Sequence, residues 1–434
     1  MSVYWAEFAW LPDGLAQRVT IDVIGSSIRS VVRDSQPSGK VLRGLTIPGF
    51  ANAHSHAFHR ALRGRTHHGR GSFWTWRERM YAVADRLDPD SYYRLARGVY
   101  AEMVLAGYTS VGEFHYLHHA PGGVPYTDPN AMGAALAAAA QDAGIRLTLL
   151  DTCYLAGGFG RAPDEHQRRF SDGNAAAWAE RAAAFEPESD LVRTGVAAHS
   201  VRAVPPEALA VVAEQADGRP VHVHLSEQPA ENSDCLAAHG RTPTALLAEA
   251  GLLGADTVAV HATHVSAADI GLLAEARVRA CFCPTTERDL GDGIGPAREF
   301  LDAGVRLCLG SDSHAVLDGF EEWRALELNE RLASRTRGRF TMAQLFTAAT
   351  DHASIGWPEA GRIEAGAAAD LVTVELDSIR TAGAEPAAAL FAASASDIRE
   401  VLVAGRQVVS DGRHLSVEQP ENILREEIRA LCPS

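Results

Sequence analysis

The chain has 434 residues, of which 46% are hydrophobic, so it can bury a sizeable core in one large and one small domain, or in two to three domains. Its formal net charge of −15 argues against a nucleic acid or an anionic membrane as partner, because both attract basic patches. No apolar run approaches the roughly 20 residues of a membrane span, and the N-terminus has neither a basic start nor an apolar signal core, so we expect a cytoplasmic protein.

Residues 1–47 are expected to form strands. Strand-like runs at 4–10, 19–23 and 28–32 are separated by turn residues, and no long helical pattern is present. A few strands of this length cannot close a core alone, so this segment needs a partner elsewhere in the chain.

From Pro48 to about residue 360, short apolar runs alternate with alanine-rich helical stretches. The expected strands cover 47–51, 108–112, 145–150, 194–198, 221–225, 257–260, 280–283 and 305–309. The expected helices cover 89–105, 130–143, 175–185, 206–215, 242–250, 267–276 and 297–303. This alternation fits a parallel (β/α)8 barrel or an open doubly wound sheet, and the polar residues at the strand ends favour the barrel.

After residue 360 the pattern returns to strands. Runs at 370–376, 401–403 and 407–409 read as strands, and 415–434 reads as a terminal helix. We therefore predict an α/β protein in which a (β/α)8 TIM-type barrel spans 48–360. Residues 1–47 and 361–434 are expected to form one small β-sandwich domain.

The end of the first barrel strand reads His54-Ser55-His56. Residues two apart on a strand face the same side, so these two imidazoles are expected to converge on one point, as a zinc-type cation requires. Such a pair alone is a weak signal, because an ordinary loop can also contain it.

Three further strand ends strengthen the hypothesis. The fifth strand carries His224 and is followed by Glu227, the sixth ends at His261, and Asp312 follows the eighth. The carboxyl ends of barrel strands meet at one face, so these residues are expected to surround a single centre. The set predicts three histidines and one aspartate around a cation, with another histidine and a glutamate beside it.

The stretches PGFANAHSH, HVHLSE, VHATH and GSDSH resemble the strand motifs of the amidohydrolase superfamily, and the form at His224 and Glu227 resembles its deaminase branch. The resemblance implies that His54, His56, His224 and Asp312 ligate one divalent metal, most simply Zn²⁺, with Fe²⁺ as an alternative. Two-metal members use a carboxylated lysine on the fourth strand, whereas the only lysine here is Lys40, outside the barrel. A two-metal hydrolase is therefore disfavoured.

Within that branch, FWTWRE, EFHYLHH, HSVRAV and CPTTERDLGDG closely resemble the enzymes that deiminate N-formimino-L-glutamate in bacterial histidine degradation. The resemblance implies that Arg77, Tyr116, His199 and Arg202 contact the substrate. Arginine suits a dicarboxylate because its guanidinium binds carboxylates bidentately. His59 departs from the family, which usually has glutamine there, but an imidazole can still donate one hydrogen bond.

The activity implied is hydrolysis of the formimino group to N-formyl-L-glutamate and ammonia. Asp312 is expected to take a proton from the metal-activated water, His261 to orient the nucleophile, and Glu227 to pass a proton to the departing nitrogen. Two alternatives are a deaminase of a guanine- or cytosine-type heterocycle and, further away, a non-catalytic metal-binding barrel. The resemblance also implies a homodimer.

Overall fold

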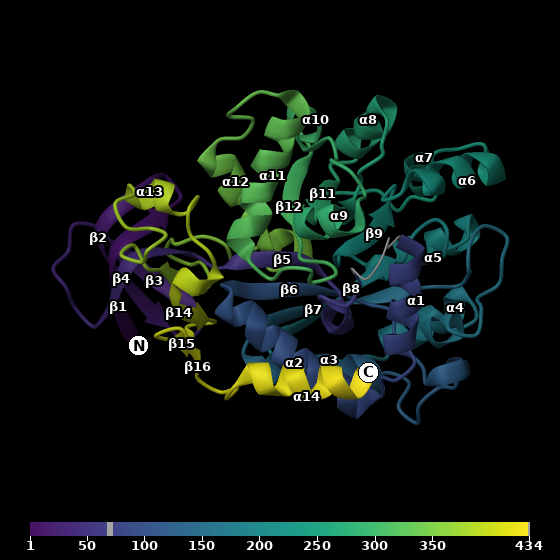
Figure 1. Cartoon of the computed structure of the whole chain (residues 1–434), viewed down its shortest axis with the longest axis horizontal. Coiled ribbons are helices and arrows are strands. Elements are labelled where there is room, and N and C mark those ends of the chain that lie inside the picture. Colours follow the sequence, from purple (N-terminus) through teal and green to yellow (C-terminus); the bar gives the residue numbers. More distant parts are fainter. Residues whose placement is uncertain (67–72, 433–434) are drawn as a thin grey trace.

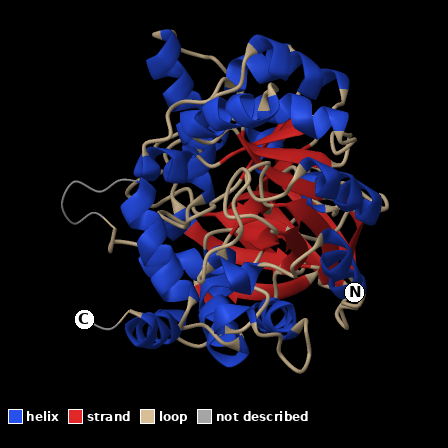
Figure 2. Ribbon diagram, turned by 90° about the vertical axis from the view of Figure 1, so that its right-hand side faces the viewer, coloured by secondary structure: helices blue, strands red, loops and turns tan. Residues whose placement is uncertain are grey.

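The computed structural model describes residues 1–66 and 73–432, which form a barrel and a second sheet beside it (Figure 1). The barrel strands are all parallel and follow one another in chain order around the sheet, enclosed by helices (Figure 2). They are β5 (Phe50–Ser55), β6 (Tyr108–His115), β7 (Arg146–Cys153), β8 (Val192–Ala198), β9 (Val221–Leu225), β10 (Thr257–His261), β11 (Arg279–Phe282) and β12 (Arg306–Leu309). The (β/α)8 prediction is confirmed.

The helices predicted within the barrel correspond to helices of the structure, with ends shifted by at most two residues. They are α2 (Pro89–Leu105), α3 (Ala131–Ala143), α4 (Ala175–Ala183), α5 (Pro206–Ala216), α7 (Pro243–Glu249), α8 (Ala267–Glu275) and α10 (Ala297–Asp302). The structure adds helices that we did not predict: α1 (Phe73–Ala84), α6 (Pro229–His239), α9 (Pro284–Leu290), α11 (Gly319–Ser334), α12 (Met342–Ala349) and α13 (Pro386–Ala389).

The barrel closes where its first strand meets the segment after its last strand. The amide nitrogens of Ser311 and Asp312 both donate to the carbonyl of His54, at 3.1 and 2.9 Å, and the amide of His56 donates to the carbonyl of Asp312 at 3.2 Å. Ser55 and Asp312 form an isolated parallel bridge. The seam of the barrel is therefore made by three of the predicted metal ligands and their neighbours.

The second sheet combines both ends of the chain, as predicted. Its strands are β1 (Ser2–Leu11), β2 (Gly14–Ile24), β3 (Ser27–Val32), β4 (Lys40–Pro48), β13 (Leu371–Val374), β14 (Ile398–Val403), β15 (Arg406–Ser410) and β16 (Arg413–His414). Strand β4 joins the two ends, because it pairs in parallel with β1 and antiparallel with β13.

The expected first barrel strand, 47–51, was placed wrongly. Ile47 and Pro48 end β4 in the second sheet, and the barrel strand β5 begins at Phe50. Gly49 is the junction, where a Cβ would lie 2.2 Å from the side chain of Thr109, so only glycine lets the chain pass this closely. The barrel strand continues past Ala51 to Ser55, so it contains His54, which the sequence placed at the end of this strand.

The terminal helix α14 (Pro420–Leu431) lies along α2 on the outside of the barrel rather than against the second sheet (Figure 1). Gly98 of α2 permits this packing, since a Cβ there would lie 3.0 Å from Leu424.

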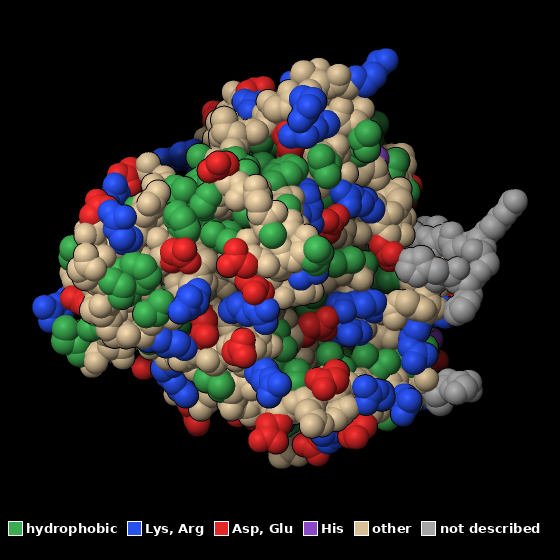
Figure 3. Space-filling view, turned by 60° about the vertical axis from the view of Figure 1, so that its left-hand side comes forward, with side chains coloured by type: hydrophobic (Ala, Val, Ile, Leu, Met, Phe, Trp, Pro, Cys, Tyr) green, Lys and Arg blue, Asp and Glu red, His purple; other side chains and the backbone are tan. Residues whose placement is uncertain are grey.

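On the face in Figure 3, acidic and basic side chains are interspersed. Among the described helices, none has the length and apolar character needed to cross a bilayer.

A buried ion pair fastens the barrel to the second sheet. Arg146, at the start of β7, places its Nε 2.7 Å from the Asp370 carboxylate just before β13, and the two side chains are 6% and 0% exposed. Asp370 also accepts a hydrogen bond from the amide of Ala404, at 2.6 Å. The pair therefore links three segments that are far apart in sequence.

We expect Arg146→Met to lower the free energy of unfolding by about 3–5 kcal/mol, because Asp370 would remain buried without its counter-charge. Urea unfolding followed by circular dichroism measures this. The matched control is Arg362→Met, which removes the exposed pair with Glu364 and is expected to cost about 1 kcal/mol or less. Equal losses in the two variants would contradict this role for the Arg146–Asp370 pair.

Candidate metal centre and active site

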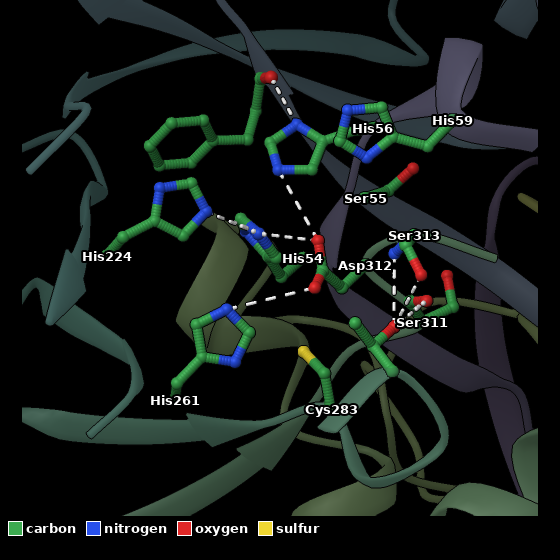
Figure 4. Close-up of polar contacts among 12 residues, drawn as sticks. His54, Ser55, His56, His59, His224, His261, Cys283, Ser311, Asp312 and Ser313 are labelled. Carbon is green, nitrogen blue, oxygen red and sulfur yellow. Dashed lines mark hydrogen bonds and ion pairs between the residues drawn. The ribbon is translucent and has the colours of Figure 1, made fainter. Parts of the chain in front are cut away.

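The structure brings the sequence-predicted site residues together around the C-terminal ends of the barrel strands. Figure 4 shows the histidines and the aspartate at the centre of this group. One cavity is lined by all of them except His54, which is fully buried beneath it. The cavity residues are His56, His59, Arg77, Tyr116, His199, Arg202, His224, Glu227, His261 and Asp312.

Three imidazoles and one carboxylate face a common point. The Nε2 atoms of His54 and His224 are 3.0 Å apart, and Oδ1 of Asp312 lies 3.4 Å from Nε2 of both His54 and His56. Nitrogen and oxygen atoms at these separations converge as they do around a small cation (Figure 4).

The hydrogen bonds on the far side of two rings assign their tautomers. Nδ1 of His56 donates to the carbonyl of Phe114 at 3.0 Å, and Nδ1 of His224 donates to the carbonyl of His199 at 2.9 Å. Each Nε2 therefore presents a lone pair to the centre. Burial lowers the pKa of His56 to about 4 and that of His224 well below its usual value, so both rings are neutral, as metal ligands must be.

His261 lies between carboxylates on the other side of the centre. Its Nε2 is 3.7 Å from Asp312 and 3.9 Å from Glu227, and its Nδ1 is 3.4 Å from Glu287. Burial alone lowers the pKa of His261, but these carboxylates outweigh it and raise the pKa to about 10. Burial has the opposite effect on Glu227, whose pKa it raises because it disfavours the charged carboxylate. The carboxylates thus create a site that favours positive charge.

These residues fit a bound divalent metal. The neutral rings of His56 and His224 aim lone pairs at the centre, and the ring of His54 and the carboxylate of Asp312 border it. The Nδ1 atom of His54 is buried without a hydrogen-bond partner among the described residues. The ligand atoms of His54, His224, His261 and Asp312 all lie within 4.8 Å of one another, as do those of His56, His59 and Asp312. Geometry therefore admits His261 and His59 beside the four ligands predicted.

Backbone strain accompanies the site. His261 and Asp312 have φ values of +68° and +42°, in the left-handed region that residues other than glycine rarely occupy. Such conformations cost about 1–3 kcal/mol each and persist where surrounding contacts enforce them. Here the seam hydrogen bonds hold Asp312 in place.

A buried carboxylate that sequence reasoning did not single out supports the segment that carries two of the predicted metal ligands. Glu113, at the end of β6, is 0% exposed; it accepts hydrogen bonds from the Ser55 hydroxyl at 2.7 Å and from the Ala57 amide at 2.6 Å. Ser55 also contacts His314 Nε2 at 3.1 Å. Both Glu113 contacts fall on the segment that carries His54 and His56.

We expect Glu113→Leu to weaken zinc binding about 10- to 100-fold, because the leucine cannot accept either hydrogen bond and the His54–His56 segment loses its support. Glu113→Gln is expected to lose less, since its amide oxygen still accepts from Ala57. Competition with a chromophoric chelator measures the affinity, and circular dichroism checks the fold. Unchanged zinc affinity in a folded Glu113→Leu protein would contradict the role.

Two guanidinium groups also line the cavity. Arg202 donates from Nε to Glu231 at 2.7 Å, and its side chain is 27% exposed. Arg77, on α1, donates from Nε to the hydroxyl of Tyr81 at 2.6 Å. Because both side chains line it, the cavity can bind carboxylates.

His59 and Tyr116 are joined by a hydrogen bond of 3.0 Å between Nε2 and the hydroxyl. This hydrogen bond fixes the orientation of the His59 ring, which lines the cavity. Burial lowers its pKa well below the usual value, so it is neutral. A neutral imidazole still provides one donor, which is the property expected at this position.

Several cavity residues were missed by sequence reasoning. Tyr154 and Phe170 come from the segment beyond β7. Gln167 links Tyr154 to Tyr81 of α1 by donating to both hydroxyls, at 2.9 and 3.0 Å. Nothing in their local sequence indicates that these loops fold over the barrel mouth. Glu287 does not line the cavity but lies beside His261, and its place in the stretch after the seventh strand gave only a weak signal.

The comparisons with known proteins agree with this geometry. Residues 45–408 match the model of the amidohydrolase family. A formimidoylglutamate deiminase of Pseudomonas aeruginosa is 40% identical over 96% of this chain and 97% of its own length. A 5-methylthioadenosine/S-adenosylhomocysteine deaminase of Natronomonas pharaonis is 31% identical, over 85% and 82%. The crystal structure of an amidohydrolase from Brucella melitensis superposes with a TM-score of 0.91 at 34% identity, covering 99% of this chain and 100% of that one.

Proposed function

The chain belongs to the amidohydrolase family, and we propose that it hydrolyses N-formimino-L-glutamate to N-formyl-L-glutamate and ammonia, a step of histidine degradation. The observation that carries the proposal is the pairing of a metal-binding centre with a wall of arginines in one cavity. Such a cavity suits a substrate with an amidine at one end and carboxylates at the other.

We assign His54, His56, His224 and Asp312 as the ligands of one Zn²⁺, with Fe²⁺ as the alternative. A single-metal site agrees with β8, which has no lysine to bridge two ions. When bound, the metal polarises water and stabilises developing negative charge. Water and substrate are held around it by the chain's own residues.

In this mechanism Asp312 accepts the proton of the attacking water as oxygen bonds to the formimino carbon. His261 supports the charge that develops in the tetrahedral intermediate. Glu227, protonated at the start, gives its proton to the imine nitrogen, which becomes an amine. This amine then receives the proton held by Asp312, the carbon–nitrogen bond breaks, and ammonia leaves. The hydroxyl proton of the intermediate passes to Glu227 as the carbonyl of the formyl product forms. The raised pKa of Glu227 suits a group that must hold and then release a proton.

Arg202 and Arg77 bind the carboxylates of the substrate, and His59, Tyr116 and His199 complete its surroundings. Because Nε of Arg202 is used by Glu231, the carboxylate is received by the remaining nitrogen atoms of that guanidinium. The role of Glu231 is then to fix the direction of the arginine.

The test is ammonia release by the zinc-loaded protein from N-formimino-L-glutamate, with guanine, cytosine and 5-methylthioadenosine in parallel. Release from the formimino compound alone supports the proposal. Release only from a heterocycle would instead support the deaminase alternative, to which the Natronomonas pharaonis relative belongs by name. No ammonia release from any of these compounds would support the remaining alternative, a non-catalytic metal-binding barrel.

A homodimer and a cytoplasmic location remain predictions. Light scattering on the eluted protein and fractionation of the producing cells would test them.

A further inference from the structure

A second cavity adjoins the active site and is not used by the proposed mechanism. It has a volume of about 160 Å³, and it shares Arg77 and Arg202 with the catalytic cavity. A third arginine, Arg161, lines only the outer cavity. The two cavities therefore meet at the arginines assigned to the substrate carboxylates.

The guanidinium of Arg161 is placed by the local backbone. It lies against Gly158, where a Cβ would be 2.7 Å from Nη2 and 3.0 Å from Nε. Gly158 has φ of +148°, a conformation that side chains disfavour, and a Cβ at this position would displace the Arg161 guanidinium. No described residue is hydrogen-bonded to or ion-paired with the Arg161 guanidinium.

The charges around the outer cavity favour an anion. Glu231 also lines it, but its carboxylate is occupied by Arg202 and by the amide of Ser226, at 2.7 and 2.9 Å. The cavity is lined in all by three arginines, Arg77, Arg161 and Arg202, and by two acids, Glu231 and Asp234. The protein as a whole carries a formal charge of −15, so a dicarboxylate approaching elsewhere meets repulsion.

Building on the proposed function, we propose that this cavity is an outer anion site in which Arg161 receives a carboxylate of the incoming dicarboxylate and passes it to Arg77 and Arg202. Arg161 acts on capture, before the amidine reaches Glu227. Its contribution is electrostatic and is therefore screened by salt.

The test compares wild type with Arg161→Gln and Gly158→Ala. We expect Arg161→Gln to lower kcat/KM for N-formimino-L-glutamate about threefold to tenfold at low ionic strength, with the loss carried by KM, and the difference to shrink in 0.5 M salt. Gly158→Ala is expected to give a similar but smaller loss by displacing the guanidinium. The control is Arg406→Gln, an exposed arginine on β15, which is expected to change neither constant.

Binding of glutarate, measured by calorimetry, gives a readout without turnover: Arg161→Gln is expected to weaken it. Wild-type kinetics and wild-type glutarate affinity in Arg161→Gln would overturn the outer site, as would a loss that persists undiminished in high salt. If the wild type does not turn over N-formimino-L-glutamate, the proposed function fails, but the glutarate measurement still tests the site.

Discussion

Glu227→Gln is expected to lower kcat about 100- to 10,000-fold while the protein still binds one metal ion. The glutamine has nearly the same shape, but it cannot carry the proton that the departing nitrogen needs. Glu227 lies 3.9 Å from His261 and lines the cavity without belonging to the proposed ligand set. Ammonia release gives the rate, and elemental analysis gives the metal content.

The matched control is Glu287→Gln. Glu287 lies on the other side of His261, where its Oε1 atom accepts from the Cys283 amide at 2.9 Å and is 3.4 Å from Nδ1 of His261. It touches neither the cavity nor the proposed metal, so we expect a smaller loss that acts through His261. Substantial turnover by Glu227→Gln, or a larger loss from Glu287→Gln, would contradict the assigned proton transfer.

Arg202→Gln is expected to lower kcat/KM by between about 30-fold and a few thousand-fold, which corresponds to a loss of about 2–5 kcal/mol in transition-state binding. The substitution removes the guanidinium that faces the substrate carboxylate in the proposal. Steady-state kinetics with N-formimino-L-glutamate measures the loss.

Part of that loss has a structural source, because Glu231 is buried and would lose its partner. A substrate that lacks one carboxylate, N-formimino-4-aminobutyrate, separates the two contributions. If Arg202 binds the missing carboxylate, the penalty of Arg202→Gln largely disappears with this analogue, whereas a structural defect lowers both rates equally. Equal losses on the two substrates would contradict the assignment.

The alternation of strands and helices and the polar strand ends were sufficient to predict the barrel. The first strand was misplaced because residues 47–51 are apolar and buried on both sides of the junction at Gly49. Without alternation, nothing in the run marks the change from one sheet to the other.

Helix α6 was missed because its sequence has too few apolar residues, whereas residues 47–51 are apolar throughout. Its sequence, PAENSDCLAAH, buries only Glu231 and Cys235, so it has no apolar stripe to reveal it. The sequence was sufficient to predict that the histidines at the strand ends lie together, because the carboxyl ends of the strands meet at one face of any such barrel. Glu113 and Tyr154 could not be found this way, since their roles depend on which loop or strand lies beside them in space.

The seam of the barrel also decides when the centre can exist. His54 is on the first barrel strand and His56 directly follows it, His224 is on the fifth, and Asp312 follows the last. A chain emerging from the ribosome therefore carries an incomplete ligand set until its final barrel strand has been synthesised. Tight capture of a cation has to wait for nearly the whole barrel, so an unfinished polypeptide has little means of holding one.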